Sequence, residues 1–231
     1  MNEYLERYKL NGFGVVEGWC SPALFEIMDF LDGCNLNRIG GCLEIGVHHG
    51  KFFILMNSLI EPPYKSYALD LFENQALNVD KSGRGNKAVF EANLARYDRH
   101  RGSNTVILSG DSTDAASQRQ LRGTVGPLRF ISIDGGHSAE HTVSDLRLAT
   151  ELIANEGIVI LDDILNRHWL GVMEGTVIFL TSRPTLVPLA IGNNKLLLCK
   201  VSFHQAYSEM LRSSSLVSKA TRFFGYSLFA L

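Results

Sequence analysis

The stretch that decides the fold is LRFISIDGGHSAEHTVSDLRLATELIANEGIVILDD, residues 128–163. It begins with an apolar run at 130–133 that ends in Asp134, and it finishes with a second apolar run at 158–161 that ends in Asp162 and Asp163. Between the two runs, apolar residues recur at the spacing of one helical face. Two buried strands around a helix form a right-handed βαβ unit, so this stretch predicts parallel strands in one α/β sheet.

The carboxyl ends of parallel strands open on the same edge of the sheet, which is where such sheets bind ligands. Asp134, Asp162 and Asp163 are therefore expected to meet in one crevice. Carboxylates at close range repel each other, and a divalent cation is the usual remedy. The alternative is that these aspartates only cap the helices that follow the two strands. Three of them at strand ends favour a metal site.

Length and composition restrict the class of protein. A chain of 231 residues with 45% apolar and 20% charged residues predicts one ordinary globular α/β domain. The net charge of −2 does not indicate a nucleic-acid partner. No apolar run approaches the roughly 20 residues that span a bilayer, and the charged N-terminus does not resemble a signal peptide. The four cysteines lack metal-site spacing and are expected to be reduced thiols in a cytoplasmic protein.

A first strand, expected at 41–45, contains Glu44 and leads into a turn with Gly46 and Gly50. Gly46 permits a tight turn and a close approach of a ligand, and Gly50 permits close packing of the helix at 51–60. The next strand, at 66–71, contains Asp70 near its end, where an acidic residue suits hydrogen bonding to ribose hydroxyls. The alternative is an ordinary βαβ turn followed by an incidental surface acid.

A third strand is expected at 105–108, before Asp111 and Ser112. Asp111 lies at another strand exit on the same edge. It either accepts a hydrogen bond from an adenine amino group or caps the helix expected at 112–121. Spacing alone does not separate these two roles.

The rest of the chain surrounds this sheet. A helix starting at Ser21 and Pro22 is expected near the N-terminus, in a segment (1–38) that packs on the sheet or covers the ligand. Two strands at 186–191 and 196–201 flank a turn and predict an antiparallel hairpin. The tail, 203–231, is expected to be helical and to pack its apolar residues on the domain (39–202) or on the partner subunit of a homodimer.

Together these motifs resemble the class I S-adenosylmethionine-dependent methyltransferases. The match rests on the glycine turn at 44–50, Asp70, the Gly-Asp-Ser segment at 110–112 and the terminal hairpin. The segment IDGGH (133–137), followed by LDD (161–163), is similar to the metal-dependent O-methyltransferases of sugars and natural products. The resemblance covers roughly residues 40–200. It implies a Rossmann-like three-layer αβα sandwich with a seven-stranded, mostly parallel sheet of order 3-2-1-4-5-7-6.

The resemblance also implies roles for individual residues. S-adenosylmethionine would be bound by residues at the strand ends, and Mg²⁺ or another hard dication by three aspartates at the same edge. Glu44 would orient the glycine turn. The implied cofactor-binding residues are Glu44, Gly46, Gly50, Asp70, Asp111, Ser112 and Asp134. The implied metal ligands are Asp134, Asp162 and Asp163. The sequence departs from the pattern at Gly136, where some sugar methyltransferases carry a second aspartate that is proposed as the base.

The expected reaction is methyl transfer to a hydroxyl of a small molecule. A free alcohol is a poor nucleophile, so a metal that binds it or a base beside it would be needed. His137 is the nearest titratable group, and an imidazole is a suitable proton acceptor near neutral pH. Its alternative role is a hydrogen bond to the start of a helix. Two other functions stay open: an NAD(P)-dependent oxidoreductase, which His48 at the middle glycine position opposes, and a non-catalytic scaffold.

Overall fold

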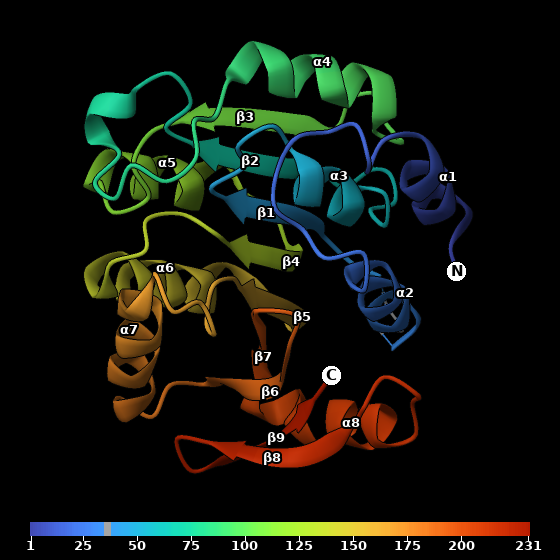
Figure 1. Ribbon diagram of the computed structural model, residues 1–231, viewed down its shortest axis with the longest axis vertical. Helices are drawn as coiled ribbons and strands as arrows, with labels where there is room; N and C mark the ends of the chain where they lie inside the picture. The colour runs from blue at the N-terminus through green and yellow to red at the C-terminus, as the bar shows by residue number, and fades with distance from the viewer. Residues whose placement is uncertain (35–37) are drawn as a thin grey trace.

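A computed structural model describes residues 1–34 and 38–231. One mixed sheet lies between two layers of helices, so the described chain is a three-layer αβα sandwich (Figure 1). The strands are β1 (Gly41–Ile45), β2 (Ser66–Asp70), β3 (Thr105–Ser109), β4 (Leu128–Ile133), β5 (Ile153–Leu161), β6 (Leu186–Gly192), β7 (Lys195–Lys200), β8 (Lys219–Phe223) and β9 (Tyr226–Ala230). The helices are α1 (Glu3–Asn11), α2 (Leu24–Cys34), α3 (Lys51–Asn57), the 3-10 turn η1 (Gln75–Leu77), α4 (Lys87–Tyr97), α5 (Ala115–Thr124), α6 (Ala139–Leu152), α7 (Leu170–Thr181) and α8 (Val201–Arg212).

The strand order is β3-β2-β1-β4-β5-β7-β6-β9-β8. Strands β1 to β5 run parallel, and β7 pairs antiparallel with both β5 and β6. The first seven positions confirm the order 3-2-1-4-5-7-6 and the antiparallel hairpin. The sheet has nine strands rather than seven, because the tail adds β8 and β9 beyond β6.

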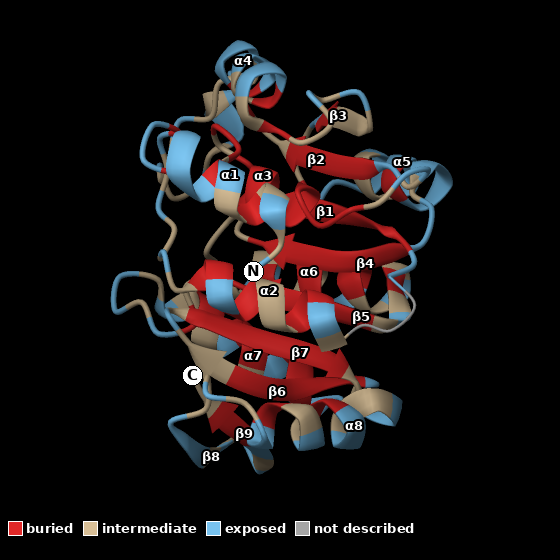
Figure 2. Ribbon diagram, turned by 90° about the vertical axis from the view of Figure 1, so that its right-hand side faces the viewer, coloured by how far each residue is buried: buried red, intermediate tan, exposed pale blue. Residues whose placement is uncertain are grey.

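Successive residues of each central strand point to opposite faces of the sheet. Phe130 and Ile158 belong to the core under α1, α2, α3, α4 and α8, whereas Ile131 and Val159 belong to the core under α5, α6 and α7. Strands covered on both faces are mostly apolar, and this is why 130–133 and 158–161 read as apolar runs, with Ser132 as a buried polar exception. Figure 2 shows the central strands buried and the outer helix surfaces exposed.

The tail corrects one expectation. Residues 203–212 continue helix α8, but Lys219–Phe223 and Tyr226–Ala230 form strands instead of a helix. The turn between them places Phe224 and Gly225 at φ 47° and 84°, a conformation that ends a helix and suits a tight turn. Strand β9 covers the free edge of β6 and buries apolar side chains, so the tail packs on its own domain.

The N-terminal segment is helical, but its helices differ from the expected ones. α1 precedes the first glycine of the chain and was not expected from the sequence; its Tyr8 hydroxyl donates to the Lys51 carbonyl at 2.9 Å. α2 begins at Leu24, three residues after Ser21, where the helix was expected to start. Both helices lie on the α3 face of the sheet (Figure 1). None of the helices in the described part of the chain combines the length and apolarity that crossing a bilayer requires.

The parallel register brings the strand ends together. The Asp134 amide donates to the Ile45 carbonyl at 2.8 Å, and the Asp162 amide donates to the Ile133 carbonyl at 2.9 Å. The ladder therefore continues one residue beyond β1, β4 and β5 before the chain leaves the sheet. The turns that carry the predicted site residues consequently start at the same level, along one edge.

Candidate active site

A cavity of about 720 Å³ opens over this edge of the sheet. Its walls come from the turns after β1 to β5, from the loop between β2 and α4, and from the hairpin turn at 193–195. Its volume is in the range typical of ligand-binding pockets. Most of the predicted site residues line it: Gly46, Asp70, Asp111, Ser112, Asp134, His137, Asp162 and Asp163. The structure thus brings together residues that are up to 117 positions apart in the sequence, from Gly46 to Asp163.

Two glycines shape the turn after β1. A Cβ on Gly46 would lie 1.8 Å from the Asp134 carbonyl oxygen, and Gly46 has φ 83°. The close approach at this glycine is therefore the backbone of the neighbouring strand exit. Gly50 has φ 88°, and a Cβ there would lie 2.6 Å from the ring of Phe90. Gly50 permits tight packing under α4, as expected from the sequence, and it does not line the cavity.

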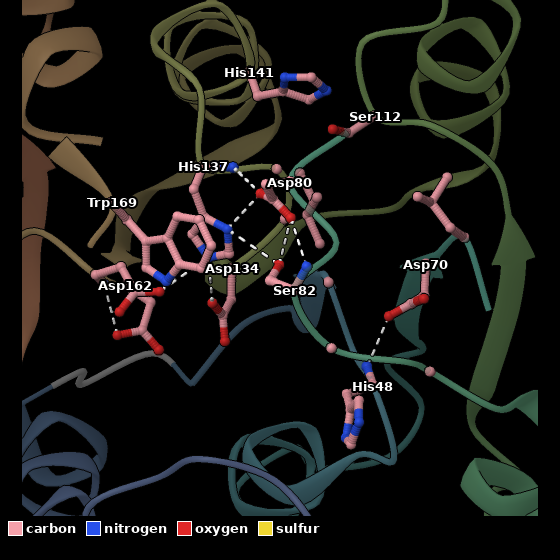
Figure 3. Close-up of a pocket in the computed structure, with 18 of the residues that line it drawn as sticks. His48, Asp70, Asp80, Ser82, Ser112, Asp134, His137, His141, Asp162 and Trp169 are labelled. Atoms are coloured by element: carbon pink, nitrogen blue, oxygen red, sulfur yellow. Dashed lines mark hydrogen bonds and ion pairs between the residues drawn. The ribbon is translucent and has the colours of Figure 1, made fainter. Parts of the chain in front are cut away.

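Asp70 fixes the same turn. Its Oδ2 accepts hydrogen bonds from the amides of Val47 at 2.6 Å and His48 at 2.7 Å, and its Oδ1 accepts from the amide of Phe72 at 2.6 Å. Gly85 packs directly against this carboxylate. Asp70 is thus a structural anchor that also faces the cavity (Figure 3). Its predicted contact with ribose would use the remaining acceptor capacity of the carboxylate.

Asp111 does not cap the next helix. Asp114 does so, through hydrogen bonds to the amides of Ala116 and Ser117, and α5 therefore begins three residues later than expected. The Asp111 Oδ1 instead accepts from the Thr113 amide and hydroxyl, each at 2.7 Å. Asp111 lies at the cavity wall together with the buried Ser112, so the capping explanation for this aspartate no longer applies.

His137 lies between two carboxylates. Its Nδ1 is 2.6 Å from Asp80 Oδ2, and its Nε2 is 2.9 Å from Asp163 Oδ2. The imidazole also stacks on Trp169, with ring centroids 4.5 Å apart and planes 14° apart (Figure 3). The ring is thus held on its two nitrogens and on one face. Ser138, rather than His137, caps α6, so the helix-start explanation does not account for the His137 ring.

The charges around His137 favour its protonated form. Burial alone would lower the pKa of this imidazole, but the hydrogen bonds to Asp163 and Asp80 outweigh burial and raise it. Burial likewise opposes ionisation of Asp80 and Asp163, and hydrogen bonds reverse the effect in both. The pKa of Asp80 falls to about 2, with Ser82 and His137 as donors, and the pKa of Asp163 falls with His137 and Asn166 as donors. The hydrogen bonds thus favour the ionised form of both carboxylates and, to the same end, the protonated form of the ring between them.

Asp80 is a site residue that the sequence does not reveal. It lies in the loop between β2 and α4, which reads only as polar and glycine-rich. Its Oδ2 also accepts from the His137 amide at 2.9 Å, and its Oδ1 accepts from the Ser82 amide at 2.9 Å. This loop therefore folds over the cavity and is fastened to the end of β4 (Figure 3). No spacing rule connects two residues that are 57 positions apart.

The three predicted metal ligands, Asp134, Asp162 and Asp163, each have different neighbours in the structure. Asp163 Oδ1 accepts from the side-chain amides of Asn166 at 2.8 Å and Asn194 at 2.6 Å. Asp162 Oδ2 instead accepts from the ammonium of Lys195, a residue that is only 3% exposed. Asp134 has its pKa raised by burial and then by the charge of Asp162, with Lys195 acting in the opposite direction. Lys195 is thus a buried cation in the position where a metal was expected.

As they stand, these residues do not fit a Mg²⁺ ion. Ligand atoms of Asp134, His137 and Asp163 lie within 4.8 Å of one another, so a cation could approach them. However, Mg²⁺ prefers six oxygens, whereas this group offers an imidazole nitrogen that already bonds two carboxylates. Asp162, the third predicted ligand, is paired with Lys195. The structure therefore neutralises the acidic strand ends with protein cations.

Glu44 does not line the cavity, and Gly136 packs tightly against a neighbouring side chain. Glu44 is buried beneath the cavity, and burial raises the pKa of its carboxyl to about 8 although Lys195 acts in the opposite direction. A Cβ on Gly136 would lie 2.7 Å from the ring of His141. The second aspartate of some sugar methyltransferases would therefore require His141 to move, which explains why a glycine is compatible with this packing.

Comparisons with known proteins agree with this geometry. A family model described as a methyltransferase domain matches residues 43–164, more than half of the chain. Among curated proteins, 8-demethyl-8-alpha-L-rhamnosyl tetracenomycin-C 2'-O-methyltransferase of Streptomyces olivaceus is 26% identical over 81 residues, which are 35% of this chain and 21% of that protein. The match thus spans only about a fifth of the relative's length.

Solved structures show the same fold. The O-methyltransferase TomG from Streptomyces achromogenes, in complex with S-adenosylmethionine, gives a TM-score of 0.58 at 15% identity and covers 87% of this chain and 91% of that chain. MycE methyltransferase, in complex with Mg, S-adenosylhomocysteine and mycinamycin VI, gives 0.52 at 18% identity and covers 86% of this chain and 53% of that chain. Together with the family match and the strand-end geometry, these likenesses identify the chain as a member of the methyltransferase domain family with the class I S-adenosylmethionine-dependent methyltransferase fold.

Proposed function

We propose that this protein is an S-adenosylmethionine-dependent O-methyltransferase that acts on a hydroxyl of a small molecule of the sugar or natural-product class. The observation that carries the proposal is His137, held between Asp80 and Asp163 on the floor of a cavity that the glycine turn borders. An oriented imidazole beside the methyl-donor site is what O-methylation of a weakly acidic hydroxyl requires.

The cofactor would lie along the strand ends. The turn at Gly46 faces the cavity and would hold the methionine portion, while Asp70 would accept from ribose hydroxyls. Asp111 and Ser112 line the wall on the far side of Asp70 and would contact the adenine. When bound, S-adenosylmethionine supplies an electrophilic methyl group on a sulfonium. The chain's own contribution is to place this group above His137 and to exclude water with the loop that contains Asp80.

In its neutral form, with the remaining ring proton on Nδ1 donated to Asp80, His137 would take the proton of the acceptor hydroxyl through Nε2. In the structure this nitrogen is bonded to Asp163, while Nδ1 is bonded to Asp80. The acceptor hydroxyl would therefore replace Asp163 as the partner of Nε2, and Asp80 would keep the ring oriented through Nδ1. Asp80 then stabilises the imidazolium that forms, in the way that an aspartate orients the histidine of a catalytic triad. Trp169, stacked on the ring, prevents it from rotating out of the cavity.

The substrate class follows from two kinds of support. The cavity is lined by carboxylates, amides and imidazoles, which are suitable partners for a polyhydroxylated acceptor. The named relatives methylate a rhamnosyl 2'-oxygen or belong to the mycinamycin pathway. The Mg²⁺ dependence expected from the resemblance is not part of this proposal: MycE was solved with Mg, but Asp162 of this chain is paired with Lys195.

The proposal can be tested by calorimetry and by methyl transfer. S-adenosylhomocysteine should bind the purified protein, and methyl transfer from S-adenosylmethionine to a panel of rhamnosylated and other glycosylated acceptors should yield an O-methyl product. His137→Gln should reduce kcat by about 10²–10⁴-fold while leaving S-adenosylhomocysteine affinity within about twofold. His168→Gln, an exposed imidazole outside the cavity, is the matched control and should retain activity. Binding of NADH without S-adenosylhomocysteine binding would instead support an oxidoreductase.

A further inference from the structure

Lys195 is a buried charge that the proposed reaction does not use. It is the first residue of β7, directly after the hairpin turn, and its side chain is 4% exposed. Its ammonium lies over the ring of Phe52, 4.8 Å from the centroid, and beside the cavity floor. Burying an ammonium is costly unless it is paired and hydrogen-bonded, so its partners define its role.

Those partners are the strand-end carboxylates. The Lys195 ammonium donates to Asp162 Oδ2, while Asp162 Oδ1 accepts from the Asp163 amide at 2.7 Å. Both oxygens of Asp162 are thus engaged by donors of the chain itself. Asp134 is close enough for its charge to act on Lys195. The ammonium therefore counters the charge of two of the three strand-end aspartates.

A divalent cation at Asp162 would have to displace this ammonium. The displaced lysine would stay buried next to Phe52, without the carboxylate that compensates its charge, and breaking a buried ion pair in this way is strongly unfavourable. Two positive charges at the same carboxylate would also repel each other. Lys195 and a metal are thus alternatives for this oxygen.

We propose that Lys195 is a built-in cation that holds Asp162 out of metal coordination, so that the acceptor pocket is organised without a divalent ion at this carboxylate. Lys195 is then a positioning residue, which fixes Asp162 and through its amide contact the adjacent Asp163. The inference rests on the proposed function only in treating this cavity as the acceptor pocket. It also implies that removing the ammonium would create a cation site that the natural protein does not have.

Mn²⁺ binding, followed by electron paramagnetic resonance, tests the inference without any turnover. In the wild-type protein, Asp162→Asn should leave Mn²⁺ affinity unchanged, because Lys195 already occupies Asp162. Lys195→Met, which keeps the length and apolar stem of the side chain, should increase Mn²⁺ affinity by about tenfold or more. Adding Asp162→Asn to Lys195→Met should abolish that gain, and Lys195→Arg, which keeps the charge, should show none.

The thermal stability of the same samples gives a second readout. Mn²⁺ should raise the melting temperature of Lys195→Met and leave that of Lys195→Arg unchanged. A wild-type protein that binds Mn²⁺ tightly and loses this binding on Asp162→Asn would overturn the inference, and this comparison does not depend on whether Lys195→Met folds. Calorimetry with S-adenosylhomocysteine on the wild type, without metal, reports on the methyltransferase proposal separately, so the two ideas can fail independently.

Discussion

Asp145 offers a quantitative prediction about stability and pH. It lies on α6 beneath the cavity, is 0% exposed, and among the described residues neither of its carboxylate oxygens makes a well-formed hydrogen bond. The pKa of this carboxyl is raised to about 7, chiefly by burial; the Ser112 hydroxyl acts in the opposite direction, and the charge of Asp111 adds to the effect of burial. In the unfolded chain the same group has a pKa of about 3.9.

The sign follows from proton binding. Between these two pKa values the unfolded chain loses the proton of Asp145 while the folded protein keeps it. The folded state is therefore favoured at low pH, and this contribution is lost as the pH rises toward the folded pKa. Each pH unit in this interval is worth about 1.4 kcal/mol. From about pH 5 to about pH 7 the contribution falls by roughly 2 kcal/mol, because the folded carboxyl begins to ionise near the upper limit.

The perturbation is Asp145→Asn, which removes the titration and keeps the shape. Urea denaturation at matched pH values gives the unfolding free energies of both proteins. The difference between variant and wild type should change by roughly 2 kcal/mol in favour of the variant between about pH 5 and about pH 7. Any cost of burying the amide is independent of pH and cancels in this comparison. Glu140→Gln, an exposed position on α6, is the control and should lack this upward trend. Parallel curves for Asp145→Asn and wild type would refute the reasoning.

Three further predictions concern the turn, a buried ion pair and the base. Gly46→Ala should destabilise the fold by more than about 2 kcal/mol in urea denaturation, because its Cβ meets a backbone carbonyl and its φ is positive. Arg129→Met should cost about 3 kcal/mol in the same assay by leaving the Asp32 carboxylate buried with less compensation, and adding Asp32→Leu should recover most of this loss. Asp80→Asn should lower the pKa of His137, so the acid limb of the kcat/KM profile should move to lower pH; an unmoved limb would exclude Asp80 as its partner.

Several features of the fold could be predicted from local patterns. The apolar runs ending in Asp134 and Asp162 identified β4 and β5, because strands buried on both faces are built mainly from apolar residues. The right-handed βαβ rule then placed these strand ends on one edge of the sheet. The tail could not be predicted in this way. Its alternation is short, and its strands are stabilised by the free edge of β6, which only the assembled sheet provides.

For the cavity, too, some features could be predicted from the sequence and others depend on the tertiary structure. The sequence by itself determined which residues leave the sheet at its ligand-binding edge, since strand direction and handedness are properties of the chain's local chemistry. The tertiary structure alone decided which cations and carboxylates face one another there. Asp80 reaches His137 across 57 positions and Lys195 reaches Asp162 across 33, through a loop and a hairpin whose paths depend on packing. Electrostatic pairing depends on distance in space, and no pattern along the chain encodes that distance for residues brought together by long-range contacts.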